Sequence, residues 1–80
     1  MNALDHLQEF EIKPSLQRIA IMQYLLDHRI HPNVDEIYTA LSDQIPTLSK
    51  TTVYNTLKLF EEHNAVKILT IDEKNTSYDI

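Results

Sequence analysis

Glycine is absent from all 80 residues of this sequence. Glycine adopts positive φ angles most readily, so any turn that needs one must use another residue, and Asn or Asp are the least strained substitutes. Asn64 and Asn75 stand where such turns are expected. Without glycine the chain also lacks the phosphate-binding loops of P-loop and dinucleotide-binding enzymes. Those two enzyme classes are therefore excluded for these residues.

Three stretches in the first half carry apolar residues at the three- and four-residue spacings of a helix. The first covers residues 3–10, and the second covers residues 16–28 with Ser15 as a suitable N-cap. The third begins after Asn33, which forms a capping-box pattern with Glu36 three residues later. The sequence thus predicts three short amphipathic helices before residue 44.

A fourth helix is predicted over residues 49–63, and the pattern changes after it. Residues 66–71 are rich in β-branched side chains, and residues 76–80 form a second short strand after a polar turn. Two helices joined by a short loop and followed by a hairpin predict a winged helix-turn-helix, which is mainly α with a small antiparallel β-hairpin. In that fold the second helix enters the DNA major groove, and the hairpin (66–80) is the wing. An all-α bundle with a frayed C-terminal tail is the alternative fold.

The predicted helix over residues 49–63 has two unlike faces. Val53, Leu57 and Phe60 recur at helical spacing on its inner face. The outer face carries residue types that contact DNA, because Thr and Tyr meet thymine methyls or phosphate, Asn bonds to base edges and Lys neutralises phosphate. An ordinary solvated helix face fits the same composition. The outer residues are Thr51, Tyr54, Asn55 and Lys58.

The charge distribution separates this surface from the rest of an acidic chain. Twelve acidic and seven basic residues give a formal net charge of −5, which argues against nucleic acid as a partner. However, residues 12–26 and 44–60 contain no acid. A fold that brings these windows together would have a local positive face, and the local field governs docking on phosphate. The windows contain Lys13, Arg18, Lys50 and Lys58.

The sequence offers no catalytic constellation. Cysteine is absent, which excludes disulfides, thiol catalysis and a cysteine-based zinc site within these residues. The acid pairs 35–36 and 61–62 diverge by about 100° on a helix, so neither converges on a substrate. No apolar run approaches the ~20 residues of a membrane span, and no basic signal-peptide start is present. We expect one non-enzymatic, cytoplasmic domain over residues 1–80, without a membrane partner.

Four segments resemble the N-terminal DNA-binding domain of the ferric uptake regulator family, most closely its peroxide-stress-regulator branch. They are LQEFEIKPSLQRIAIMQYL, HPNVDEIYTAL, LSKTTVYNTLKLFEEHNAVKIL and the final SYDI, so the likeness runs from about Leu4 to Ile80. The resemblance implies a dimeric, metal-responsive transcriptional repressor that binds an A/T-rich palindrome in double-stranded DNA. A winged-helix protein-interaction module without direct base readout is the alternative function.

The resemblance also implies roles for single residues. Tyr54 and Asn55 match the major-groove positions of the recognition helix, and Lys13 matches a basic position that approaches the minor groove. Arg18 matches the arginine that opens the second helix. Pro14 and Leu16 differ from the residues of many members, so the loop before that helix is expected to differ. The complete predicted DNA-binding set is Lys13, Arg18, Ser49, Lys50, Thr51, Tyr54, Asn55 and Lys58.

For metal, His31 matches a regulatory-site ligand of the family, and Asp79 matches an acidic position that is more often Asp in the peroxide-sensing branch. Two ligands are too few for a first-row metal, so we expect no cofactor held within this chain. In a full-length parent they become candidate ligands for iron, manganese or zinc. The family's C-terminal dimerisation domain, with its structural zinc site, is expected to be absent from this chain. The remaining histidines show no ligand spacing and are expected at the surface: His6, His28 and His63.

Overall fold

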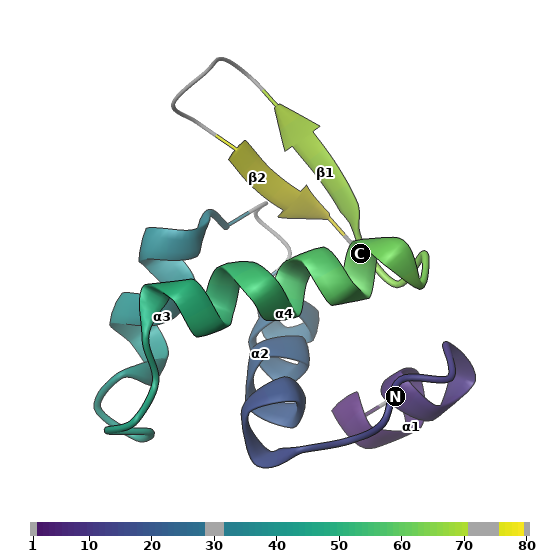
Figure 1. Ribbon diagram of the computed structural model, residues 1–80, viewed down its shortest axis with the longest axis horizontal. Coiled ribbons are helices and arrows are strands. Elements are labelled where there is room, and N and C mark those ends of the chain that lie inside the picture. Colours follow the sequence, from purple (N-terminus) through teal and green to yellow (C-terminus); the bar gives the residue numbers. More distant parts are fainter. Residues whose placement is uncertain (1, 29–31, 71–75, 80) are drawn as a thin grey trace.

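The computed structural model describes residues 2–28, 32–70 and 76–79. Helices and a hairpin follow one another in the predicted order (Figure 1), which confirms the winged helix-turn-helix. The all-α alternative is wrong, because the last two elements pair as an antiparallel sheet. The elements are α1 (Ala3–Glu9), α2 (Leu16–Asp27), α3 (Val34–Leu41), α4 (Lys50–Glu62), β1 (Lys67–Thr70) and β2 (Thr76–Asp79).

Side-chain caps set the start of each helix. Ser15, Asn33 and Ser49 each accept a hydrogen bond from the backbone N–H three residues later. The Glu36 carboxylate in turn accepts from the Asn33 N–H at 3.3 Å, which completes the predicted capping box. Because such caps satisfy otherwise unpaired N–H groups, the helix starts are determined within four residues of sequence.

Two of the described helices are followed, two residues after their last helical residue, by a residue with positive φ. Asn64 has φ 64° after α4, as predicted, whereas Glu11 has φ 59° after α1 and was not predicted. Glutamate carries no sequence signal for this conformation, which glycine or asparagine normally supplies. Asn75 lies outside the described residues. Each turn is closed by a backbone hydrogen bond across the last helical turn: Ile12 N–H to Leu7 C=O, 2.9 Å, and Ala65 N–H to Phe60 C=O, 2.8 Å.

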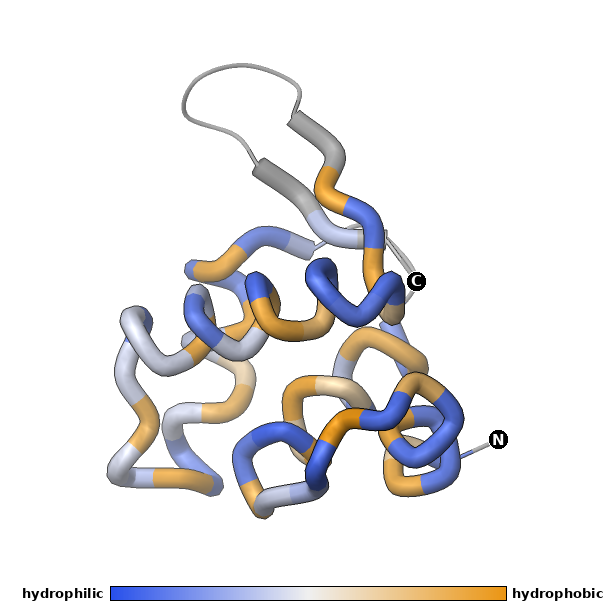
Figure 2. Tube along the Cα trace, turned by 45° about the vertical axis from the view of Figure 1, so that its right-hand side comes forward, coloured by the Kyte–Doolittle hydropathy of each residue, from blue (hydrophilic) through white to orange (hydrophobic). Residues whose placement is uncertain are grey.

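One apolar core joins the four helices, and apolar and polar stretches alternate along them (Figure 2). The predicted inner face of α4 is confirmed, because Val53, Leu57 and Phe60 are all fully buried. Burying such side chains contributes about 1.5–3 kcal/mol each. This packing holds α4 in place and leaves its opposite face to solvent.

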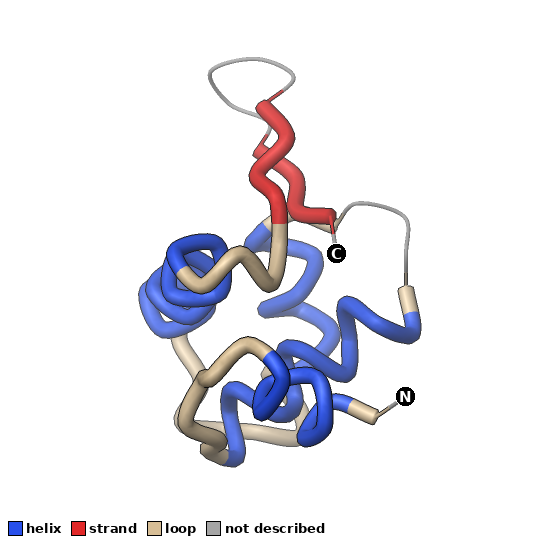
Figure 3. Tube along the Cα trace, turned by 90° about the vertical axis from the view of Figure 1, so that its right-hand side faces the viewer, coloured by secondary structure: helices blue, strands red, loops and turns tan. Residues whose placement is uncertain are grey.

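The hairpin is anchored at one strand and otherwise projects from the helices (Figure 3). Strand β1 pairs antiparallel with β2, with Ile68 opposite Tyr78. The Tyr78 side chain is only 3% exposed, and its N–H donates to the Pro32 carbonyl at 3.1 Å. The wing is therefore fixed both to the core and to Pro32, two residues before the start of α3.

The histidines do not all lie at the surface. His28 is exposed as expected, but His6 is buried and packs its ring against Phe10 with centroids 5.1 Å apart. The expectation for His6 was wrong because position 6 faces the core side of α1. His63 is half-buried, and its Nδ1 lies 3.1 Å from the Phe10 carbonyl oxygen, which links the ends of α1 and α4.

Candidate nucleic-acid interface

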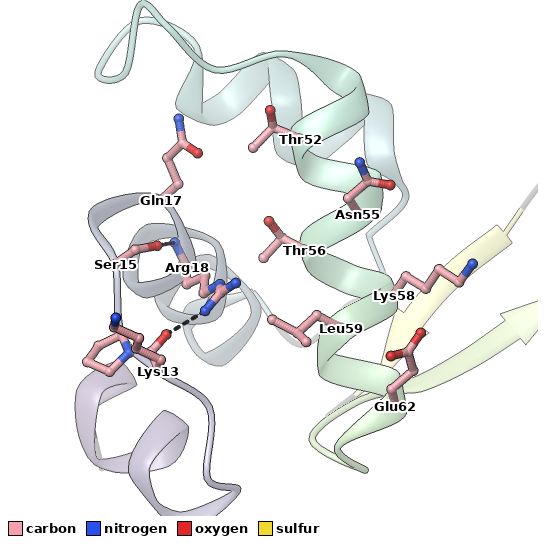
Figure 4. A pocket seen from close by; sticks show the side chains of 11 residues that line it. Lys13, Ser15, Gln17, Arg18, Thr52, Asn55, Thr56, Lys58, Leu59 and Glu62 are labelled. Carbon is pink, nitrogen blue, oxygen red and sulfur yellow. Dashed lines mark hydrogen bonds between the residues drawn. The ribbon is translucent and has the colours of Figure 1, made fainter.

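An open groove of about 670 Å³ runs between the segment 13–18 and one flank of α4 (Figure 4). Three basic side chains and a single acid line it, so its local charge is opposite in sign to that of the whole chain. These charged residues are Lys13, Arg18, Lys58 and Glu62. The fold thus brings together parts of the two acid-free windows, 12–26 and 44–60, which is the condition under which the charge pattern gives a local positive face.

The Arg18 side chain braces one wall of the groove. Its Nη1 donates to the Lys13 carbonyl at 2.8 Å, across the connection between α1 and α2 (Figure 4). The Arg18 N–H donates to the Ser15 hydroxyl, which caps α2. Lys13 itself is exposed, whereas Arg18 is half-buried. Arg18 therefore positions the backbone that presents Lys13 to solvent.

The opposite wall is the flank of α4. The predicted outer face is confirmed in that Thr51, Tyr54, Asn55 and Lys58 are all exposed. Of these four, Asn55 and Lys58 line the groove. Sequence reasoning missed other lining residues: one lies on α2, and three lie on α4 beside its outer face, where spacing gives no signal. These are Gln17, Thr52, Thr56 and Leu59.

Tyr54 lies on the wing side of α4 rather than in the groove. Its side chain is 52% exposed. Burial raises the pKa of the Tyr78 phenol on strand β2, and the nearby Tyr54 adds to the increase. The exposed face of α4 is therefore bounded by the groove on one side and by the hairpin on the other.

Ser49 and Lys50 stand apart from the groove. The Ser49 hydroxyl accepts from the Thr52 N–H at 3.0 Å and so serves as the cap of α4. The Lys50 ammonium lies 3.1 Å from the Asp35 carboxylate on α3. The structure does not bring Lys50 to the basic residues of the segment 13–18.

The two predicted metal ligands stay predictions. His31 and the Asp79 side chain lie outside what the structure describes. Among the described residues, no group of three or more His, Cys, Asp or Glu side chains could hold a metal ion. Pro32 follows His31 in the sequence, and Tyr78 precedes Asp79. A hydrogen bond from the Tyr78 N–H to the Pro32 carbonyl joins these two neighbours.

Comparisons with known proteins match this fold and sequence to one family. The profile of the Ferric uptake regulator family matches residues 9–80. The chain belongs to the ferric uptake regulator family. This confirms the resemblance seen in the sequence. None of the described helices of this family member has the length and apolar character needed to cross a membrane.

Relatives of this family member include peroxide regulators. It is 40% identical over 77 residues to the peroxide operon regulator of Bacillus subtilis (strain 168), covering 96% of this chain and 53% of that protein. It is also 40% identical over 73 residues to the peroxide-responsive repressor PerR of Staphylococcus epidermidis, covering 91% and 49%. The chain thus spans about half the length of the curated relatives it matches.

Solved structures give the same result. The structure of PerR from Streptococcus pyogenes, described in terms of peroxide sensing and gene regulation, superimposes with a TM-score of 0.85 at 35% identity. That match covers 100% of this chain and 58% of the other. A manganese uptake regulator superimposes with a TM-score of 0.86 at 27% identity, covering 98% and 57%. Both likenesses extend over essentially the whole chain.

Proposed function

We propose that residues 1–80 bind double-stranded DNA sequence-specifically, as the DNA-binding part of a cytoplasmic, metal-responsive transcriptional repressor. The observation that carries this proposal is the basic groove beside the exposed face of α4, formed where two acid-free windows meet. Membership of a family whose relatives are named as regulators and repressors supports it and argues against an enzyme.

In the proposed complex α4 enters the major groove, as the second helix of such a motif does. Tyr54 and Asn55 then contact base edges, because both are exposed on the outer face. Lys58 neutralises a phosphate, and Lys13 approaches the minor groove from the loop that Arg18 braces. The hairpin flanks the duplex as a wing.

The longer regulator is proposed to act as a homodimer on an A/T-rich palindrome. A two-fold symmetric dimer places two recognition helices on half-sites about one helical turn apart, so its operator mirrors that symmetry. A/T-rich tracts have a narrow minor groove with enhanced negative potential, which suits a lysine such as Lys13.

For the metal response we propose His31 and Asp79 as two ligands of an iron, manganese or zinc ion in the longer protein. Imidazole and carboxylate groups both bind such ions, and further ligands must come from beyond this pair. The Tyr78–Pro32 backbone bond, which ties strand β2 to the start of α3, supports the choice. A bound metal would there link the wing to the helices.

The test is to select duplexes from a randomised pool with the chain and to measure affinity by fluorescence anisotropy. A selected duplex and a scrambled duplex are compared at two salt concentrations, where binding should weaken as salt rises because counterions are released. Tyr54→Ala should lose the discrimination between the two duplexes, whereas Lys58→Ala should weaken both alike.

Gln44→Ala is the matched control, because Gln44 is exposed and does not line the groove. It should leave both affinities unchanged. If the selection enriches no sequence, or if Tyr54→Ala retains full discrimination, direct readout by α4 is refuted. The protein-interaction module would then be the better interpretation of the fold.

A further inference from the structure

An ion pair holds the first residue of the proposed recognition helix away from the groove. The Lys50 ammonium lies 3.1 Å from a carboxylate oxygen of Asp35. It also lies 5.8 Å from the centroid of the Tyr38 ring. Asp35 and Tyr38 are three residues apart on α3 and therefore share a face of that helix. Two groups on α3 thus attract this one side chain from α4.

Helix dipoles explain why the pair forms at this place. Asp35 lies in the first turn of α3, where a negative charge is favourable. Lys50 lies in the first turn of α4, where a positive charge is unfavourable, and α4 has no acid of its own in that turn. The Asp35 carboxylate therefore compensates a charge that α4 does not balance.

The ion pair is also exposed enough for another anion to replace Asp35 as the partner of Lys50. The Lys50 side chain is 61% exposed and that of Asp35 is 73% exposed. Exposed ion pairs are weak and are screened by salt. A DNA phosphate offers Lys50 the same chemistry as a carboxylate, namely an anionic oxygen acceptor.

We propose that Asp35 competes with DNA phosphate for Lys50 and so lowers the affinity of the chain for all duplexes. The inference rests on the proposed function, in which the N-terminal part of α4 approaches the DNA. Lys50 must leave Asp35 to reach a phosphate, and the unpaired carboxylate then lies close to the duplex. Because a phosphate contact carries no sequence information, Asp35 lowers selected and non-specific binding by the same factor.

Asp35→Asn is the direct test, measured by anisotropy on the selected and the scrambled duplex. Removing the competitor should tighten binding to both duplexes by about 1.4- to fivefold, the range of an exposed ion pair. The plot of log affinity against log salt should also become steeper by up to about 0.9, the increment for one additional neutralised phosphate.

Glu36→Gln is the matched control, because it removes an equal charge from the neighbouring position of α3. Glutamine preserves the capping box, in which the Glu36 side chain accepts from the Asn33 N–H. Any gain that comes only from reduced repulsion between α3 and DNA should appear in this variant as well. The gain of Asp35→Asn should exceed it.

A double-mutant cycle with Lys50→Gln decides whether Asp35 acts through Lys50. In the Lys50→Gln background, Asp35→Asn should raise the DNA affinity by no more than Glu36→Gln does. An equal gain in both backgrounds would overturn the inference, as would a loss of affinity in Asp35→Asn. If the unsubstituted chain selects no duplex, the proposed function fails instead, so the two failures are distinguishable.

Discussion

Replacing Glu11 by glycine should stabilise the chain, although glycine is absent from the whole sequence. Glu11 lies in the turn two residues after the last residue of α1 and has φ 59°, a left-handed conformation that costs an ordinary L-residue about 1–2 kcal/mol. Glycine avoids this cost but loses about 0.5–1 kcal/mol more backbone entropy on folding. The Glu11 side chain is exposed, so little packing is lost. The net gain should be about 0–1.5 kcal/mol, with a central value of about 0.75 kcal/mol.

The assay is urea unfolding followed by circular dichroism at 222 nm. The midpoint should rise with an unchanged slope, since a change of slope would indicate an altered unfolded or native state. In a domain of this size about 1 kcal/mol corresponds to a rise of roughly 4–8 °C in Tm. Glu11→Ala is a control that removes the side chain without relieving the backbone, and it should give no gain.

Asn64→Gly tests the same reasoning at the matching turn after α4. Asn64 has φ 64°, nearly the same as Glu11, but asparagine tolerates this conformation better than glutamate. Its gain should therefore be the smaller of the two. A larger gain at Asn64 than at Glu11, or a loss of stability in Glu11→Gly, would refute the argument from backbone strain.

Three further predictions concern the interface and its support. Ser49→Ala should cost about 1 kcal/mol in urea unfolding, because the Thr52 N–H loses its cap; an unchanged midpoint would contradict this. Phe60→Ala should cost about 3–5 kcal/mol and unfold most of the chain, seen as lost helical dichroism, because its ring is fully buried. Burial raises the Tyr78 pKa, so the folded state favours the neutral phenol. The resulting stability is present below pH ~10 and is lost as pH rises further. The urea midpoint should therefore fall less between pH ~9 and pH ~11 in Tyr78→Phe than in the unsubstituted chain.

The sequence alone determined the local features of this protein. The caps at Ser15, Asn33 and Ser49 could be predicted because each acts on a backbone group three residues away. The buried and exposed faces of α4 followed from helical spacing. The positive φ at Glu11 was not predictable in this way, because no residue type marks it.

Only the tertiary structure decided how these features combine. The meeting of windows 12–26 and 44–60 in one groove depends on core contacts between helices that are far apart in the sequence. The packing of α3 beside α4 likewise places Lys50 next to Asp35, whereas the acid-free window 44–60 had indicated only that Lys50 belongs to the DNA-binding set. Local hydrogen bonds act over a few residues and can be predicted from sequence, whereas charge neighbours depend on the packing of the whole core.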